Sequence, residues 1–539
     1  MTEGCRSTPE ALGTPPPGPF PQGVHPPPPP GSYPSAPYLS GQYPPGQYPT
    51  GQYPPGQYPP FGYGTAGHGV LPYRVPPRRP GAGVAAAVVL CLVLIAAMGT
   101  AGMVFLISFS GPGRALTGTG HPGTVREVPG GKGGTGGEDE EDLTPERRFD
   151  QDVRIALEAR TSALRGRNEK AFLASVDSAD PALVARQRQT FRNLVQFSLA
   201  EPVYRDVEDG GTASSAVAGG REFGVALVHR LGKADVEPVA LGYEETWVRR
   251  GGAVMLAKSV PGRGLARSRS PGPIDGIALK VAGGGLVTVA AGPDVPMPTV
   301  TKVDKIAEKA AVTVRRLWGA RPGPQGFVVF LTRSKTAKQS WYGGTTVAAS
   351  SGFCASLYAA ETAATREVPL RLGGARIVID MAKTRGNADL ALTLRHEFTH
   401  AQTIAVQAVR TSADQAYPVW AEEGFAAWSE EREVPLARNQ RLLDLRYLAQ
   451  RGQFRTGLPP GRPRDFYSSR EETIGLNYAM SAMVFRYIAE RWGSAQAIAY
   501  YTWIASGRSG PAQAVLGISS QEFEKAWTAW LVKQVRSGR

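Results

Sequence analysis

Residues 396–400 read H-E-F-T-H, which combines two imidazoles and a carboxylate at a spacing that can hold a metal ion. On a helix, His396 and His400 are one turn apart and share a face, so both rings can reach the same ion. Glu397 is then beside that ion, where its carboxylate can act as general base towards a water molecule. Residues 387–395, which read NADLALTLR, favour the helix that this arrangement requires.

A second acidic segment follows, because residues 417–430 read YPVWAEEGFAAWSE. The pattern W-x-x-E-G-F-A after H-E-x-x-H resembles the gluzincin metallopeptidases, which include the M1 aminopeptidases and the bacterial peptidase MA-like families. The resemblance implies that Glu423, the Glu before the Gly, is the third zinc ligand, with the fourth position left for water. Glu422 is the alternative, since adjacent helical residues point about 100° apart and only one can face the zinc. The register of the motif favours Glu423.

The chain departs from the M1 pattern in two respects. There are 22 residues between His400 and Glu423, a few more than is usual, and VRTSADQAYP is interpreted as a longer loop. No G-x-M-E-N motif occurs, so the aminopeptidase specificity of M1 enzymes is not implied. The peptidase MA-like families need only the zinc-binding core, and the resemblance to them is therefore the better one.

The segment 476–493 resembles the helix that follows the zinc site in the MA-like families. Tyr478 in this segment is expected to stabilise the tetrahedral oxyanion, because a phenol can donate a hydrogen bond to it; the alternative is a core aromatic residue like Tyr487. The implied mechanism is that zinc activates a water, and that Glu397 takes its proton and later delivers it to the leaving amine.

The last unit, residues 286–539, is predicted to be a gluzincin-like metallopeptidase domain, mainly α-helical with a small sheet. Segments 325–332 and 373–380 read as strands, and the second precedes the H-E-x-x-H helix. In the resembled families such an edge strand can hold an extended peptide by main-chain hydrogen bonds. Cys354 lies between the two strands, either as a buried small hydrophobe or as a redox-active or inhibitory thiol.

Residues 144–261 are predicted to form a separate α+β domain. Two helical segments are followed by four alternating, β-rich segments, and the last two are joined at Gly251-Gly252, a hairpin signal. This order resembles the cystatin-like fold of NTF2-like domains. His229 is a lone His in one of the strands, where we interpret it as a structural residue. The predicted fold class of the whole chain is α+β.

The segment 81–109 contains 29 residues and no charged side chain, which is long enough for a single transmembrane helix. A signal peptide would begin near residue 1 and would have a shorter apolar region. Arg74, Arg78 and Arg79 precede the segment, whereas an acidic run follows it within the Gly-rich linker 110–143. The positive-inside rule therefore predicts a single-pass protein of the plasma membrane, with a cytoplasmic N-terminus and extracytoplasmic C-terminal domains.

The first 80 residues carry 24 of the 46 Pro and few aliphatic side chains, so we expect this tail to be disordered. The unit GQYPP recurs with little change over residues 41–60, either as a multivalent site for a cytoplasmic partner or as a solvated extension without one. The composition also resembles that of actinobacterial membrane proteins. The three Cys are too far apart in this organisation for a disulfide framework or a Cys-based zinc site.

The net charge of +14 is concentrated in the last unit, where residues 291–539 carry 32 basic and 21 acidic side chains. We expect no nucleic acid partner outside the cell. Anionic lipid head groups or cell-wall polymers could meet this charge, or it reflects scattered, solvated Arg. The sequence thus predicts a membrane-anchored extracytoplasmic zinc metallopeptidase acting on peptides or proteins. The alternative is a non-catalytic membrane-tethered sensor or scaffold, or a cell-wall-binding protein, that retains a zinc site.

Overall fold

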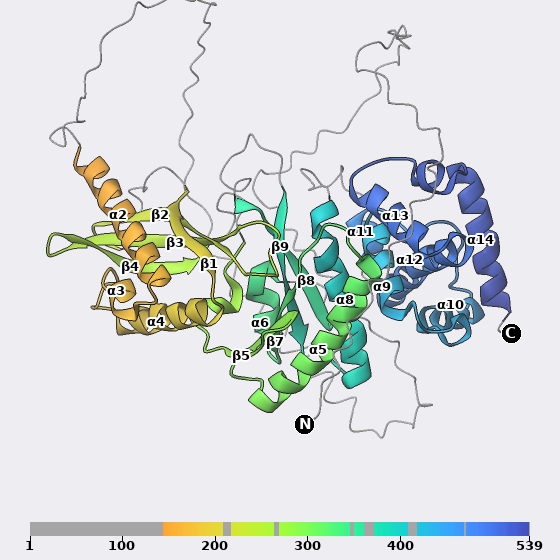
Figure 1. The fold of residues 1–539 in the computed structure, drawn as a ribbon, viewed down its shortest axis with the longest axis horizontal. Helices are drawn as coiled ribbons and strands as arrows, with labels where there is room; N and C mark the ends of the chain where they lie inside the picture. The colour runs from red at the N-terminus through yellow and green to blue at the C-terminus, as the bar shows by residue number, and fades with distance from the viewer. Residues whose placement is uncertain are drawn as a thin grey trace, which may run out of the picture. The chain divides into compact units, whose positions relative to one another are not determined.

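The computed structural model describes the chain in seven stretches, residues 144–207, 217–262, 269–344, 350–360, 371–407, 418–467 and 470–537. The predicted tail 1–80, transmembrane segment 81–109 and linker 110–143 lie outside the described residues. Among the helices of the described stretches, none combines the length and the apolar character that crossing a membrane requires. These stretches form a mixed fold of helices and two β-sheets, in agreement with the predicted mixture of both (Figure 1).

The N-terminal part consists of three helices followed by a four-stranded antiparallel sheet in the order β1-β2-β3-β4. Thr144 and Asp180 cap the two longer helices, and each cap is followed by a Pro in the first turn. The predicted hairpin at Gly251-Gly252 joins β3 and β4. The NTF2-like resemblance stays a prediction. The elements are α2 (Pro145–Arg165), α3 (Glu169–Leu173), α4 (Pro181–Gln196), β1 (Ala200–Asp206), β2 (Gly220–Arg230), β3 (Val239–Arg250) and β4 (Ala253–Pro261).

A second, five-stranded sheet has the order β5-β6-β7-β9-β8. β6, β7 and β9 run parallel, and β5 and β8 are antiparallel strands at the two edges. The interpretation of segment 373–380 as an edge strand is wrong, because β9 pairs with β7 on one side and with β8 on the other. Its nearly continuous burial is that of a strand covered on both faces. The strands are β5 (Lys280–Gly283), β6 (Val287–Ala291), β7 (Phe327–Thr332), β8 (Gly352–Tyr358) and β9 (Leu372–Asp380).

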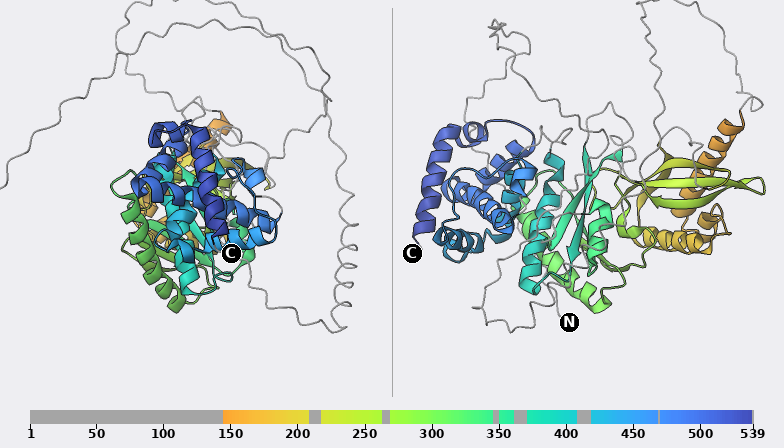
Figure 2. Two further views of the ribbon diagram at one scale, coloured as in Figure 1. Left: turned by 90° about the vertical axis from the view of Figure 1, so that its right-hand side faces the viewer. Right: turned by 180° about the vertical axis from the view of Figure 1, so that it is seen from behind.

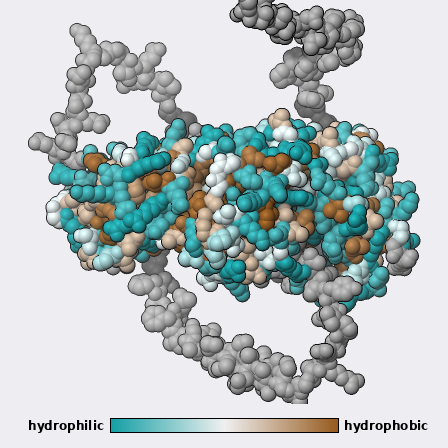
Figure 3. All heavy atoms as spheres, turned by 60° about the horizontal axis from the view of Figure 1, so that its bottom comes forward, coloured by the Kyte–Doolittle hydropathy of each residue, from teal (hydrophilic) through white to brown (hydrophobic). Residues whose placement is uncertain are grey.

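Two long helices, α5 (Met297–Trp318) and α8 (Asn387–Thr403), cover one face of this sheet (Figures 1 and 2). Further along the chain, a helical part packs around its own apolar core. The main helices of this helical part are α9 (Val419–Glu431), α10 (Gln440–Gln450), α11 (Pro463–Phe466), α12 (Glu471–Trp492), α13 (Ser494–Ala505) and α14 (Ser520–Arg536). On the face of the molecule in Figure 3, hydrophilic residues predominate and apolar ones form smaller areas.

The other face of the five-stranded sheet packs against the N-terminal part, and the two share one hydrophobic core. The rings of Phe197, after α4, and Phe330, on β7, have centroids 5.7 Å apart. Asp235 and Arg376 form a doubly hydrogen-bonded ion pair there, with Oδ1–Nη1 and Oδ2–Nη2 distances of 2.6 and 2.9 Å. Both side chains are 0% exposed. The β2–β3 side of the molecule and the β8–β9 side are therefore joined by apolar and ionic contacts.

His229 belongs to the same junction, as a fully buried residue of β2. Its Nδ1 is 3.3 Å from the carbonyl oxygen of Leu227, and its Nε2 is 3.4 Å from Nη2 of Arg376. Burial, and then the neighbouring guanidinium, lower the pKa of His229 to about 4. The imidazole is therefore neutral in the folded protein at neutral pH.

The low pKa of His229 predicts a loss of stability in acid. Since the unfolded chain takes up the proton near pH 6.5 and the folded chain only near pH 4, stability falls as the pH falls through this window. The contribution is roughly 3 kcal/mol, at about 1.4 kcal/mol per pH unit. Urea unfolding at pH 7 and pH 4 should show a smaller decrease for His229→Gln than for wild type. Equal decreases would contradict this role.

Candidate metal centre

Helix α8 presents one face to the five-stranded sheet and another to α9. Leu390, Leu394 and Phe398, at intervals of four, pack against the β-sheet. His396 and His400 lie on the face that meets α9, and both are buried. The apolar face of α8 therefore anchors the H-E-x-x-H segment on the sheet. The ring nitrogens of the two His residues, on the other face, point towards α9.

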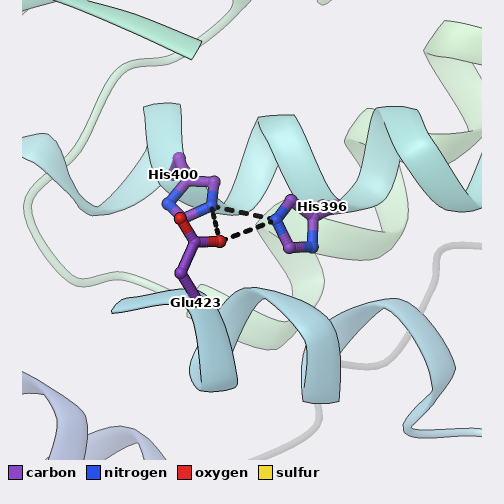
Figure 4. A group of neighbouring side chains, drawn as sticks. All are labelled: His396, His400 and Glu423. Atoms are coloured by element: carbon purple, nitrogen blue, oxygen red, sulfur yellow. Dashed lines mark hydrogen bonds and ion pairs between the residues drawn. The ribbon is translucent and has the colours of Figure 1, made fainter. Parts of the chain in front are cut away.

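The structure brings His396, His400 and Glu423 together (Figure 4). The two Nε2 atoms are 3.1 Å apart, and Oε2 of Glu423 is 3.3 Å from the first and 3.5 Å from the second. Zinc bonds of about 2.0–2.1 Å in tetrahedral geometry place neighbouring ligand atoms about 3.3 Å apart. The three side chains thus have the chemistry and the separations of a zinc site with one coordination position left over.

The electrostatics of this cluster also favour a cation. Burial alone would lower the pKa of His396, but Glu423, Glu430 and Glu397 together raise it to about 10. Burial likewise opposes ionisation of Glu423, yet His400 and His396 hold its pKa below the usual range. The surrounding carboxylates therefore stabilise positive charge at the point where the ring nitrogens converge, and a metal ion binding there would displace a proton.

A second layer of carboxylates faces the outer ring nitrogens. Glu430 Oε2 is 3.5 Å from Nδ1 of His396, and Glu422 Oε1 is 3.7 Å from Nδ1 of His400. Carboxylates in this position orient the ring and select the tautomer that leaves Nε2 free for a metal. Glu422 is therefore in the outer layer, whereas Glu423 faces both Nε2 atoms, as the motif register predicts.

Gly424 explains how α9 and α12 can meet beside the cluster. A Cβ atom at this position would lie 2.6 Å from the carbonyl oxygen of Ser481, so a larger residue would push the two helices apart. This close contact places Tyr478 of α12 beside the site, with its ring centroid 6.2 Å from that of His396. Tyr478 is 3% exposed and also packs on Phe466. Its part in catalysis stays a prediction.

Glu397 is fully buried and faces the first residue of edge strand β8. A Cβ atom at Gly352 would lie 3.3 Å from Oε1 of Glu397, so the bare backbone of β8 comes close to the carboxylate. Cys354, two residues further along, is also buried. Burial, and then Glu397, raise the pKa of its thiol, which keeps it neutral and agrees with its interpretation as a small buried side chain.

Tyr467 is a site residue that sequence reasoning missed. It follows α11, and its hydroxyl donates a short hydrogen bond to Oε1 of Glu423. That bond leaves the other oxygen, Oε2, facing His396 and His400. No spacing rule relates Tyr467 to the ligands, and it lies 44 positions after Glu423, so nothing in the sequence pattern indicated it.

We predict that Tyr467→Phe weakens zinc binding about 10- to 100-fold, because a partner that orients a ligand is lost while the ring is kept. Competition with a chromophoric chelator measures the affinity directly, without an activity assay. Tyr447→Phe is the matched control, since Tyr447 is 47% exposed and lies on α10. An affinity equal to that of wild type would show that Tyr467 does not position Glu423.

Comparisons with solved structures give neighbours at a low level of similarity. No family model matches the sequence, and no curated protein matches it. One neighbour is a mutant of a two-domain M1 zinc metallopeptidase bound to L-arginine, with TM-score 0.28 and 12% identity over 53% of this chain. Another is an M1 zinc metallopeptidase from Deinococcus radiodurans, with TM-score 0.27 and 14% identity over 52% of this chain. The matches cover 58% of each neighbour. The functional argument therefore rests on the geometry of the site.

Proposed function

We propose that this protein is a zinc-dependent peptidase. The observation that carries the proposal is the triangle of His396, His400 and Glu423, with Glu397 beside it on the same helix. Three protein ligands and one remaining position are the pattern of a catalytic rather than a purely structural zinc site. Glu397 is buried next to the first ligand along the helix and is not needed as a ligand itself, which suits a general base.

In this proposal, residues of the chain act in each step of peptide hydrolysis. Zinc, when bound, supplies a Lewis acid that polarises a carbonyl group and lowers the pKa of a water molecule. The Glu397 carboxylate accepts the proton of the attacking water and then gives it to the nitrogen of the leaving amine. The hydroxyl of Tyr478 donates a hydrogen bond to the oxyanion that forms at the scissile carbonyl. Tyr467, Glu422 and Glu430 keep the ligands in place.

The edge strand β8 is the proposed binding position for the peptide. An extended peptide can add to an exposed sheet edge through main-chain hydrogen bonds. β8 is a largely buried edge strand of the five-stranded sheet, and its first residue, Gly352, lies next to Glu397. A peptide bound along β8 would therefore pass the general base. A substituent at Gly352 would occupy space between the strand and the carboxylate.

The proposed location of this activity is outside the cell, at the plasma membrane. It is supported by the uncharged segment 81–109 and by the Arg residues that precede it. The substrate is then an extracytoplasmic peptide or protein. The Pro- and Tyr-rich segment 1–80 would remain on the cytoplasmic side, where it is available to a partner there.

The experiment that tests the peptidase combines metal analysis with a peptide library. We expect the purified full chain to contain about one zinc per molecule and to cleave peptides, to lose both on chelation, and to regain both when zinc is restored. Bound zinc without cleavage of any peptide would instead favour the non-catalytic sensor or scaffold. The failure to bind zinc at all would refute both functions.

A further inference from the structure

A second candidate site lies in the N-terminal part of the described chain, apart from the metal centre. A cavity of about 590 Å³ opens among the C-terminal ends of α2 and α4 and the edge strand β1. This volume lies within the range of about 300–1,000 Å³ that is typical of sites for small molecules. The apolar side chains in its lining are Leu164, Leu194 and Val228, which are buried, and Val195, Leu199 and Val203, which are partly exposed.

The charged groups at this cavity are mainly cationic. Three guanidinium groups, those of Arg165, Arg167 and Arg205, line it together with one carboxylate, that of Glu201. Nε of Arg165 donates to the carbonyl oxygen of Pro202 at 3.1 Å. Within the stretches that the structure describes, Arg167 and Arg205 have no hydrogen-bonding or ionic side-chain partner. An anionic group could bind to both, because guanidinium groups bind carboxylate and phosphate oxygens well.

The backbone around the cavity is held in an unfavourable conformation. The described residues include four non-Gly positions with positive φ, and three of them line this cavity: Arg167 at 52°, Ser198 at 51° and Glu201 at 51°. The first two follow the ends of α2 and α4, where Gly is the usual residue. A side chain in this conformation costs roughly 1–2 kcal/mol. Strained residues that gather at one place are a feature of ligand sites.

A purely structural explanation accounts for only part of these features. The carbonyl ends of α2 and α4 favour cations nearby, which gives the Arg residues one role. That role is available to any Lys or Arg in the last helical turn. It does not require Arg167 at a position that favours Gly, nor a cavity beside it with Leu and Val side chains in its wall. The combination points instead to a ligand that is both anionic and apolar.

We propose that this cavity binds an anionic amphiphile, whose carboxylate or phosphate head group contacts Arg167 and Arg205 and whose apolar chain lies along the Leu and Val wall. The acidic run 138–142 of the same chain cannot supply the anion. Residues 138–144 extend to about 24 Å at most. Helix α2, whose far end lines the cavity, is about 32 Å long. The proposed ligand is a separate molecule.

The test uses the full chain in nanodiscs of zwitterionic lipid, with empty nanodiscs as the blank. Calorimetric titration with octanoate should give saturable binding, with octyl phosphate binding at the same site. Octanol, which lacks the charge, and inorganic phosphate, which lacks the chain, should both bind at least tenfold more weakly. Equal binding of octanol would overturn the anionic part of the proposal, and equal binding of inorganic phosphate would overturn the apolar part.

Arg167→Gly distinguishes binding from folding. This change removes the guanidinium and relieves the backbone, so thermal unfolding should occur at a higher temperature while octanoate affinity falls at least tenfold. Arg147→Ala is the matched control, since it removes an exposed guanidinium near the opposite end of α2, outside the cavity, and should leave octanoate affinity unchanged. Unchanged affinity in Arg167→Gly, or an equal loss in Arg147→Ala, would overturn the assignment of the head group to Arg167.

Discussion

Replacing Glu397 with Gln should lower kcat/KM for peptide hydrolysis by about 10²- to 10⁴-fold and leave the zinc content unchanged. Gln has the size of Glu and cannot accept the proton of the attacking water. The side chain is fully buried against β8, so the replacement should also keep its position. Steady-state kinetics and metal analysis of the same preparation measure the two effects separately.

Glu422→Gln is the matched control for that replacement. Glu422 lies 3.7 Å from Nδ1 of His400, on the outer side of the ring. Its loss should weaken zinc binding, while activity at saturating zinc stays within about tenfold of wild type. If Glu397→Gln retains its activity, or if it loses its zinc, the assignment of Glu397 as general base is wrong.

The second large expected effect is on the free energy of unfolding, from a replacement at the junction between the N-terminal part and the five-stranded sheet. Asp235→Asn should lower the free energy of unfolding by about 3–5 kcal/mol, because it leaves the Arg376 guanidinium buried without its counter-charge. Both side chains are 0% exposed in the folded chain. Urea denaturation of the purified variant, followed by circular dichroism, gives this energy.

An exposed ion pair at the same junction provides the comparison. Arg371 and Glu237 are 3.1 Å apart, with side chains 53% and 35% exposed. Glu237→Gln should therefore cost at most about 1 kcal/mol. The double replacement Asp235→Leu with Arg376→Met should recover much of the stability that Asp235→Asn loses, since no charge is then buried. Equal costs for Asp235→Asn and Glu237→Gln would show that the buried pair does not hold the junction.

The sequence could indicate that His396, His400 and Glu423 come together, because their relation is local. His396 and His400 are related by the helical repeat, and Glu423 is identified by the E-G pair that allows α9 to approach α12. Tyr467 could not be found in this way. A loop brings it to Glu423, and no periodicity describes a loop.

Long-range pairing limited what could be predicted of the fold. The apolar run of β9 indicates a strand, but its place inside the sheet depends on β8, whose residues Gly352–Tyr358 include small and polar side chains. Asp235 and Arg376 are 141 positions apart, so their pairing appears only in three dimensions. The hairpin at Gly251-Gly252 was predictable, because its signal lies between the two strands that it joins.

The packing of the N-terminal part on the sheet has a consequence for the order of synthesis. Ala226, Val228 and Ala240 are covered by Ala360, and Phe197 is covered by Phe330. These covering residues leave the ribosome well after the first four strands are complete. At about 5–20 residues per second, the delay from residue 261 to residue 380 is on the order of ten seconds. During that interval the nascent chain presents an apolar face without its partner, which is the kind of surface that molecular chaperones bind.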